Sequence, residues 1–208
     1  LTKLDAVVAI ILLICLSGVG LASVISNPAN RPPRVAYLYP AYGGTQNVWV
    51  SDIDNPDSAQ QLTFSEIGIF DYDVSPDGRF LAFSERDGEA GDLATLRLLD
   101  IHNNTVTELV DCVAIVAYCT TPSFSPDGKL LAYQRSESLN GRFGLSRIWL
   151  VDMTSANYDT VPLIADTQVV GHSPIWSRDN KTLAFYSADT TQQGILIYDF
   201  VPRGDDDV

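Results

Sequence analysis

The chain has 208 residues, with 13 Lys and Arg against 26 Asp and Glu, so its formal net charge is −13. Binding to the phosphate backbone of a nucleic acid requires clustered basic residues, and this composition therefore argues against a nucleic-acid partner. We interpret the acidity as a solvated surface. The sequence contains no G-x-S-x-G, P-loop or G-x-G-x-x-G motif. It therefore predicts neither a catalytic nucleophile nor a bound cofactor.

The N-terminal part of the chain is apolar, and residues 6–30 contain no charged side chain. The core of this stretch, residues 6–25, corresponds to about 30 Å of helix, which is enough to cross a bilayer. We predict a transmembrane helix within an N-terminal segment of residues 1–30, with residues 6–26 in contact with the lipid bilayer. The alternative is a cleaved signal peptide, for which Leu21-Ala22-Ser23 offers a small-residue cleavage site.

Residues 31–34, Arg-Pro-Pro-Arg, form a short linker, and the two adjacent prolines make it extended and stiff. Such a linker would hold the following domain close to a membrane. Lys3 precedes the apolar stretch, whereas Arg31 and Arg34 follow it, so the distribution of positive charge does not decide the orientation of the helix.

The rest of the chain is organised around a repeated turn motif. The three copies read Y-D-V-S-P-D-G-R-F-L-A-F around Ser75, P-S-F-S-P-D-G-K-L-L-A-Y around Ser125 and P-I-W-S-R-D-N-K-T-L-A-F around Ser177. The serines are 50 and 52 residues apart, and a fixed period of this size indicates a repeat architecture. Proline, aspartate and glycine favour a turn between two strands, and asparagine can take the place of glycine at φ > 0. The turn residues are Ser75, Pro76, Asp77, Gly78, Ser125, Pro126, Asp127, Gly128, Ser177, Asp179 and Asn180.

A second landmark repeats in phase with the turns. Four apolar segments each end in an aspartate, and these aspartates are 48, 52 and 47 residues apart. They are Asp52, Asp100, Asp152 and Asp199. We interpret them as residues that end a strand and begin a turn.

The motif S-P-D-G-[RK]-x-[LI]-A-[FY], followed by a strand that ends in aspartate, resembles the WD-like β-propeller repeat of the TolB type. Repeats of this type also form the propeller domains of prolyl-oligopeptidase-like enzymes. The resemblance covers roughly residues 35–200, and it implies four-stranded blades around a central channel. It is specific for the fold and does not by itself indicate a function.

On this alignment, the domain of residues 35–208 contains blades near residues 35–66, 67–115, 116–168 and 169–202. Blade 1 begins at its second strand, because Ala36-Tyr37 aligns with Ala82-Phe83. The predicted strands are 35–38, 47–53 and 60–64 in blade 1, 70–75, 80–85, 95–101 and 105–110 in blade 2, 122–125, 130–135, 147–153 and 160–164 in blade 3, and 174–177, 182–187 and 194–201 in blade 4.

The predicted fold class is therefore all-β, a β-propeller of about four partial or complete four-stranded blades, preceded by one transmembrane helix. Propellers usually close with 4–8 blades, and an exposed sheet edge readily pairs with another chain. We therefore expect these blades either to belong to a larger ring or to form an open arc whose edges a partner covers.

Two pairs of side chains are candidates for a specific role. Asp71 and Asp73 lie two residues apart on a predicted inner strand, where paired carboxylates could bind Ca²⁺. The alternative is hydrogen bonding within the blade.

Cys112 and Cys119 would lie more than about 20 Å apart on a straight strand, so a disulfide requires the intervening segment to fold back. Such a bond suits an oxidising compartment, and the alternative is two buried free thiols.

We interpret the chain as a membrane-anchored, non-catalytic propeller. On this interpretation it is a protein-interaction or scaffold subunit at the extracytoplasmic surface of a bacterial membrane, with other membrane or envelope proteins as partners. The first alternative is the N-terminal propeller portion of a longer peptidase-like enzyme or sensor. The second is a cell-envelope factor similar to TolB that binds a lipoprotein.

Overall fold

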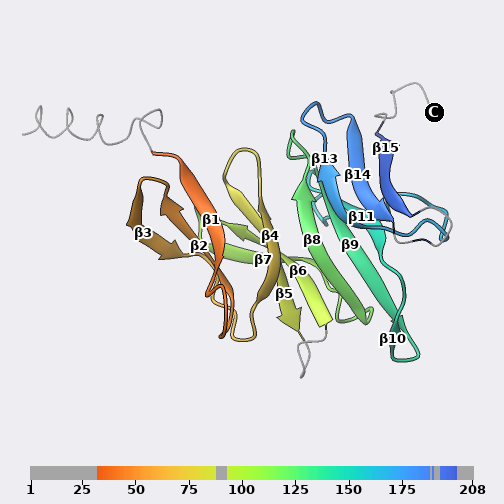
Figure 1. The fold of residues 1–208 in the computed structure, drawn as a ribbon, viewed down its shortest axis with the longest axis horizontal. Coiled ribbons are helices and arrows are strands. Elements are labelled where there is room, and N and C mark those ends of the chain that lie inside the picture. The colour runs from red at the N-terminus through yellow and green to blue at the C-terminus, as the bar shows by residue number, and fades with distance from the viewer. Residues whose placement is uncertain (1–31, 88–92, 188, 190–192, 201–208) are drawn as a thin grey trace, which may run out of the picture. The chain divides into compact units, whose positions relative to one another are not determined.

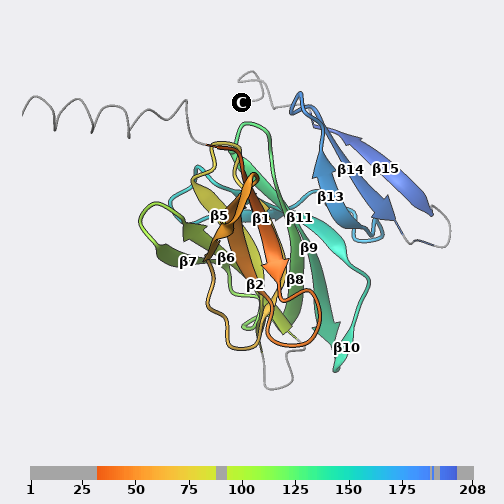
Figure 2. The ribbon, with the colours of Figure 1, turned by 60° about the vertical axis from the view of Figure 1, so that its left-hand side comes forward.

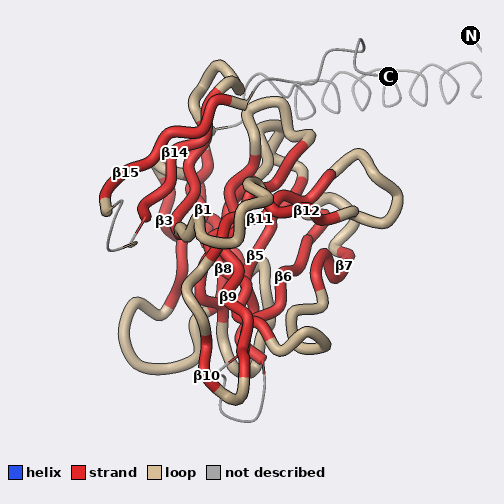
Figure 3. Tube along the Cα trace, turned by 90° about the vertical axis from the view of Figure 1, so that its right-hand side faces the viewer, coloured by secondary structure: helices blue, strands red, loops and turns tan. Residues whose placement is uncertain are grey.

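The computed structural model describes residues 32–87, 93–187, 189 and 193–200. Its regular structure is entirely β, as the tube in Figure 3 shows. The predicted transmembrane helix lies outside these residues, and no helix in the described part of the chain is long and apolar enough to cross a membrane. The all-β part of the predicted fold class is confirmed.

The chain divides into a small unit, residues 1–35 and 51–59, and a large unit, residues 36–50 and 60–208. In the small unit, Ser58 Oγ accepts a hydrogen bond from the Asp52 amide (2.8 Å) and donates one to the Asn55 carbonyl (2.7 Å). The Ile53 amide donates to the Pro33 carbonyl at 2.8 Å. These bonds satisfy the backbone of the tight turn that follows Asp52.

Strand pairing gives three sheets, of three, nine and three strands, and the nine-stranded sheet is joined in its middle by one parallel pair, Ala94 of β6 with Tyr118 of β8. We divide that sheet at this pair according to the sequence repeat, and we name the resulting four groups of strands blades 1 to 4 (Figure 1). Blade 1 contains β1 (Arg34–Tyr39), β2 (Asn47–Asp52) and β3 (Asn55–Gln61). Blade 2 contains β4 (Ile69–Val74), β5 (Phe80–Asp87), β6 (Leu93–Asp100) and β7 (Thr105–Val110). Blade 3 contains β8 (Ala117–Phe124), β9 (Leu130–Leu139), β10 (Arg142–Phe143), β11 (Arg147–Asp152) and β12 (Thr160–Pro162). Blade 4 contains β13 (His172–Trp176), β14 (Thr182–Ser187) and β15 (Gly194–Asp199).

Successive blades of the large unit are joined by apolar cores. The second strand of each later blade contributes a leucine and an aromatic residue, namely Leu81 and Phe83, Leu131 and Tyr133, and Leu183 and Phe185. The blade before supplies an alanine and two aliphatic residues, namely Ala82, Leu96 and Leu98 in blade 2 and Ala132, Ile148 and Leu150 in blade 3. Burying each large apolar side chain stabilises the fold by about 1.5–3 kcal/mol, so these cores hold the repeats together.

Polar contacts reinforce the join between blades 3 and 4, which Figure 2 shows side by side. The indole Nε1 of Trp176 donates a hydrogen bond to the Ser123 carbonyl at 3.1 Å. Asn180 Nδ2 donates to Asp127 Oδ2 at 3.1 Å, which links the two turns. Blade 4 therefore contacts blade 3 both through its core and through its turn.

The repeated turns all use the same hydrogen bonds. In the first, Ser75 Oγ donates to Asp77 Oδ1 (2.6 Å) and accepts from the Phe80 amide (2.8 Å), while the Arg79 amide also donates to Asp77 Oδ1 (3.0 Å). Gly78 has a φ of 71°, and Asn180 takes the same conformation in blade 4 with a φ of 63°. The hydrogen bond from the Ser75 hydroxyl is the main reason that the pKa of Asp77 lies below its usual value.

The structure moves the predicted strand boundaries by more than two residues at three places, namely in β3, at the start of β8 and at the end of β9, which runs to residue 139 and not to 135. The prediction of a strand over residues 60–64 is wrong, because the last strand of blade 1 is β3, residues 55–61. Pro56, Asp57 and Ser58 have low β propensity, which hid this edge strand in the sequence. The first strand of blade 3 begins at Ala117, five residues before the predicted start at residue 122, and β10 was not predicted.

The hydroxyl of Ser75 should contribute more to the free energy of unfolding at neutral pH than at acidic pH. A carboxylate whose pKa is lowered in the folded state stabilises the fold above its unfolded pKa, and this stabilisation is lost as the pH falls through the folded pKa. We expect Ser75→Ala to lower the free energy of unfolding by about 1 kcal/mol at pH 7 and by less below about pH 3. Urea unfolding followed by tryptophan fluorescence measures both values. Ser138→Ala, outside the turns, is the control, and an equal loss at both pH values would contradict the assignment.

Candidate interaction surface

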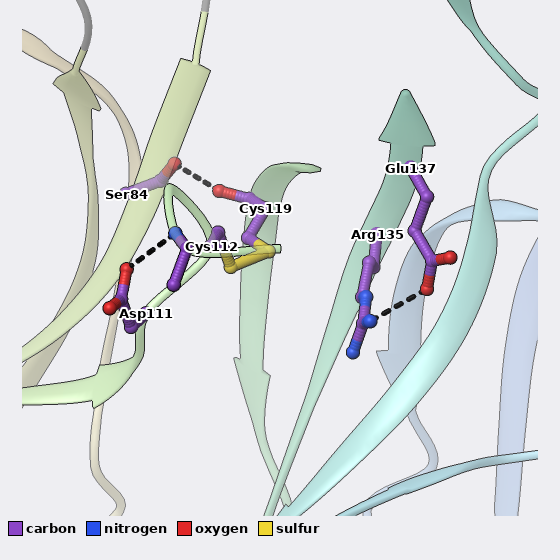
Figure 4. Close-up of a disulfide and its surroundings, with 7 residues drawn as sticks. Ser84, Asp111, Cys112, Cys119, Arg135 and Glu137 are labelled. Atoms are coloured by element: carbon purple, nitrogen blue, oxygen red, sulfur yellow. Dashed lines mark hydrogen bonds and ion pairs between the residues drawn. A yellow bond between two sulfur atoms is a disulfide. The ribbon is translucent and has the colours of Figure 1, made fainter. Parts of the chain in front are cut away.

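A disulfide closes the loop between blades 2 and 3. Cys112 and Cys119 are both buried and bonded, with their Cα atoms 6.2 Å apart (Figure 4). The Ala117 amide donates to the Cys112 carbonyl at 2.7 Å, and the Val116 amide donates to the Val113 carbonyl at 3.0 Å. The segment therefore folds back on itself, as a disulfide between these two positions requires. We name residues 112–119 the clamped loop.

The clamped loop is tied to the blades on both sides. Ser84 Oγ of β5 donates a hydrogen bond to the Cys119 carbonyl at 2.6 Å (Figure 4), and the Ser138 amide of β9 donates to the Val116 carbonyl at 2.9 Å. Val116 has a φ of 50°, which is a strained conformation for a β-branched residue. The flanking bonds hold it there, so the loop has a defined shape.

This end of blades 2 and 3 exposes apolar side chains. Ile115 and Val116 are exposed on the clamped loop, and Phe143 and Leu145 are exposed on the neighbouring turn after β9. The Val116 carbonyl bonds to Ser138, and Ser138 pairs with Phe143 in the β9–β10 hairpin, so the two apolar segments are adjacent. Large apolar side chains that cluster on loops are typical of binding surfaces.

A row of aromatic rings runs beside these segments. The ring centroids of Phe70 and Tyr118 lie 4.9 Å apart, and those of Tyr118 and Phe143 lie 6.3 Å apart, each pair in an edge-on arrangement. The Arg86 guanidinium lies 3.6 Å from the centroid of Phe70, a cation–π contact. Burial raises the pKa of Tyr118, and the charge of Arg86 partly opposes this rise. We name Phe70, Tyr118 and Phe143 the aromatic row.

Arg135 of β9, which lies opposite Cys119 in the sheet, is paired within the protein. Arg135 lies 2.6 Å from Glu137 (Figure 4), and its guanidinium also lies 4.1 Å from the ring centroid of Trp149. The exposed apolar side chains beside this internal ion pair suit a protein partner better than a charged small molecule.

Asp71 and Asp73 lie on β4 as predicted, and the structure gives them unlike surroundings. Asp73 Oδ2 accepts a hydrogen bond from the Phe124 amide of blade 3 at 2.7 Å, and its Oδ1 accepts from the Val74 amide at 2.9 Å. Asp71 Oδ1 accepts from the Tyr72 amide at 2.9 Å. Burial raises the pKa of both carboxyl groups. Asp73 therefore joins two blades, and the described residues contain no cluster of three or more potential metal-ligating side chains.

A cavity of about 210 Å³ lies at the end of blades 2 and 3 that carries the repeated turns. Its lining includes Phe80, Phe124, Met153 and Tyr158 together with the turns at Ser75 and Asp127. The carboxylates of both turns already accept hydrogen bonds from their own serine hydroxyls. The cavity is therefore built from structural turns, and we assign no ligand to it.

Sequence reasoning identified the two cysteines and the two aspartates but missed the aromatic row. Phe70, Tyr118 and Phe143 are far apart in the sequence, and Phe143 lies in the β9–β10 hairpin, which no pattern predicted. The run of five apolar residues between the cysteines was the available signal. This run resembles a buried strand in the sequence. The disulfide between Cys112 and Cys119 folds it into a loop, on which Ile115 and Val116 are exposed.

Comparisons with known proteins agree with this architecture. No family model matches the chain. It is 28% identical over 131 residues to dipeptidyl-peptidase 5 from Porphyromonas gingivalis, a match that covers 62% of this chain and 19% of the peptidase. The structure is similar to TolB from Acinetobacter baumannii, with a TM-score of 0.60, 22% identity and coverage of 80% of this chain and 39% of that one. A putative TolB from Agrobacterium tumefaciens gives a TM-score of 0.61 at 17% identity, over 80% of this chain and 57% of that one.

These likenesses show a β-propeller fold. They extend to dipeptidyl peptidase 4 from Porphyromonas gingivalis, with a TM-score of 0.54, 14% identity and coverage of 80% of this chain and 29% of that one. The resemblance to TolB-type and peptidase propellers that the repeats predicted is therefore confirmed at the level of the fold. The chain spans about a fifth of the peptidase that it matches in sequence and 39–57% of the two TolB proteins.

Replacing Asp73 should separate its charge from its hydrogen bond. We expect Asp73→Ala to lower the free energy of unfolding by about 1–3 kcal/mol, because the buried Phe124 amide loses its acceptor. Asp73→Asn retains an acceptor oxygen and should cost less at pH 7. The pKa of Asp73 is raised in the folded protein, so this carboxyl group stabilises the fold at low pH, and the stabilisation is lost as the pH rises through the folded pKa. Asparagine does not titrate, so the free energy of unfolding of the Asn variant should lack this decrease with rising pH. Equal losses for the two variants would refute the inter-blade role, and Asp71→Asn is the comparison.

Removing the disulfide should loosen the clamped loop. We expect Cys112→Ala/Cys119→Ala to lower the free energy of unfolding by about 2–4 kcal/mol and to speed amide hydrogen exchange in residues 112–119. Chemical denaturation and hydrogen-exchange mass spectrometry measure the two effects. A reductant should destabilise the unmodified protein and leave the variant unchanged. Unchanged exchange in the variant would mean that the hydrogen bonds alone hold the loop.

Proposed function

We propose that this protein is a membrane-anchored, non-catalytic β-propeller that acts as a protein-interaction subunit at the extracytoplasmic surface of a membrane. The observation that carries the proposal is the apolar surface formed by the clamped loop, the aromatic row and Leu145. It presents Ile115, Val116, Phe143 and Leu145 to solvent on segments that hydrogen bonds and a disulfide hold in place. Preorganised apolar side chains lose little conformational entropy on binding, which favours a specific protein partner.

The disulfide supports the proposed compartment. Structural disulfides persist in oxidising environments outside the cytoplasm, and both cysteines are buried between blades. The apolar residues 6–26 and the stiff linker of residues 31–34 support an anchor that keeps the propeller near the bilayer. The proposed partners are therefore other membrane or envelope proteins.

A second candidate function follows from the peptidase match. Because the chain aligns with only 19% of dipeptidyl-peptidase 5, it could be the propeller portion of a longer peptidase-like enzyme or sensor. The similarity to TolB supports the third candidate, an envelope factor that binds a lipoprotein. In all three candidate functions the propeller binds another protein or another domain, and the proposed contact surface is the apolar surface at the clamped loop.

Substitutions on the apolar surface test the proposal. We expect Phe143→Asp/Leu145→Asp to abolish co-purification of the full chain with its membrane partners, because charges would be buried at the interface. The matched control is Val106→Asp/Val161→Asp, which changes two exposed valines on the outer strands β7 and β12. Extraction in mild detergent, followed by native mass spectrometry, gives the composition and stoichiometry of each complex.

The same measurement separates the candidates. A complex of fixed stoichiometry that only the Phe143/Leu145 variant loses supports the interaction subunit. An unmodified chain that runs alone would contradict it. An intact mass well above 22.7 kDa would instead support the longer enzyme, and a free form that lacks residues 1–25 would support the TolB-like factor.

A further inference from the structure

A cavity of about 310 Å³ lies between the end of blade 1 and the outer strands of blade 2. Its size is within the range of pockets that bind small molecules. Phe64 and Val106 are 73% and 53% exposed, so the cavity opens to solvent. Its apolar walls come from the chain that follows β3 and from β5, β6 and β7. These walls are formed by Leu62, Phe64, Phe83, Leu99 and Val106.

The repeat explains why the joint between blades 1 and 2 is hollow. Counted back from the strand-end aspartates, Arg97 is equivalent to Trp149. Counted from the turn serines, Glu85 is equivalent to Arg135. In blade 3, Trp149 packs against the apolar core that joins blades 2 and 3, and the Arg135 guanidinium lies 4.1 Å from its ring centroid. In blade 2 an arginine takes the place of this indole ring, so less of the space beside the core is filled.

The last residues of blade 1 leave the other side of the cavity open. Phe64 follows Asp52 by the same number of residues as Cys112 follows Asp100, so the two positions are equivalent. Cys112 is fully buried at the next joint, whereas the aromatic ring of Phe64 is exposed. Phe64 therefore forms a lip of the cavity and not a part of the core.

The corresponding space between blades 3 and 4 is closed. The Leu62 amide donates to the Val48 carbonyl at 2.8 Å, and the Leu163 amide donates to the Ile148 carbonyl at 2.9 Å, which makes the two leucines equivalent. The space beside Leu163 measures only about 10 Å³. The larger cavity is therefore a property of the side chains at the first joint and not of the repeat itself.

Three charged side chains lie together on the face of blade 2 that borders the cavity. Arg97 Nε lies 2.6 Å from Glu85 Oε2, and Arg97 Nη2 lies 3.9 Å from Glu108 Oε2. The strand register places Glu108 opposite Arg97. It also places Val106 opposite Leu99, so Val106 and Glu108 lie on the same face of β7. Two carboxylates face one guanidinium, so the cluster carries one uncompensated negative charge.

We propose that this cavity binds a small organic cation, namely a free primary amine that carries one ring or a short alkyl chain. The ammonium group donates hydrogen bonds to the Glu108 carboxylate, and the apolar body packs against Val106 and Phe83. The uncompensated charge favours a monocation over a neutral molecule or an anion of the same shape. The nearby aromatic rings add a further preference for a cation. The ligand is a small molecule, so the proposal is independent of the protein partner assigned to the clamped loop.

Three probes of one shape and different charge test the proposal. At pH 7 para-fluorobenzylamine is a cation, para-fluorobenzyl alcohol is neutral and para-fluorobenzoate is an anion. Ligand-observed fluorine NMR on the full chain in mild detergent gives a Kd for each probe, and detergent alone gives the baseline. We expect the amine to bind about fivefold more tightly than the alcohol, and the benzoate to bind most weakly, because only the amine gains a charge-assisted hydrogen bond. An amine that binds no more tightly than the alcohol overturns the proposal.

Charge variants test the assigned carboxylate. Glu108→Gln keeps the shape of the side chain and should weaken amine binding about fivefold, with no change for the alcohol. The matched control is Glu137→Gln, which removes one negative charge from β9 and should change neither probe. Arg97→Gln should have the opposite effect, because it leaves both carboxylates without their cation, and the amine should bind about fivefold more tightly. The Tm of each variant shows that it is folded. Amine binding that is unchanged in folded Glu108→Gln, or weaker in folded Arg97→Gln, contradicts the assignment and overturns the proposal.

A tethered competitor tests the location. Val106→Lys places an aliphatic chain and an ammonium group beside Glu108, and it should weaken binding of the free amine about tenfold. Val161→Lys adds the same charge to the exposed outer strand β12 and should leave amine binding unchanged. An equal loss in both variants would mean that the amine responds to the overall charge of the protein, and this result would also rule out the cavity as the binding site.

Discussion

The apolar contact between successive blades is the interaction on which the rest of the structure depends. A sheet of three or four strands has two faces and cannot bury both by itself, so each repeat gains stability only from its neighbour. The contact is asymmetric, with a leucine and an aromatic residue on one side and an alanine with two aliphatic residues on the other. The small side chain of Ala132 is buried in one cluster with the bulky Trp176 and Phe185 of blade 4.

The polar groups follow from this packing. A dry interface between blades would leave buried backbone donors and acceptors without partners, and each would cost stability. The Asp73 carboxylate therefore meets the Phe124 amide, and the Trp176 indole meets the Ser123 carbonyl. The turn serines and aspartates satisfy one another in the same way. Asp73 and the turn aspartates Asp77 and Asp127 thus accept hydrogen bonds from groups within and between the repeats.

Once the blades are fixed, the loops can carry function without adding to the core. The clamped loop is bonded to β5 on one side and β9 on the other, and it exposes apolar side chains that the core does not use. The similarity to TolB and to peptidases shows that this scaffold serves unlike proteins. Function is therefore to be sought in the loops, where this chain differs from a plain repeat.

The sequence by itself determined the all-β propeller fold, the repeat period and the turns, because Ser75, Ser125 and Ser177 act through bonds to residues that are close in the sequence. It left open whether Cys112 and Cys119 meet, and it misplaced the last strand of blade 1. Only the tertiary structure decided that Asp73 joins two blades and that Phe70, Tyr118 and Phe143 form one row. It also decided that Ile195 and Ile197 are exposed whereas their equivalents in blade 3, Ile148 and Leu150, are buried. Alternation along a strand shows which residues share a face, but whether that face is covered depends on a neighbour that local sequence does not specify.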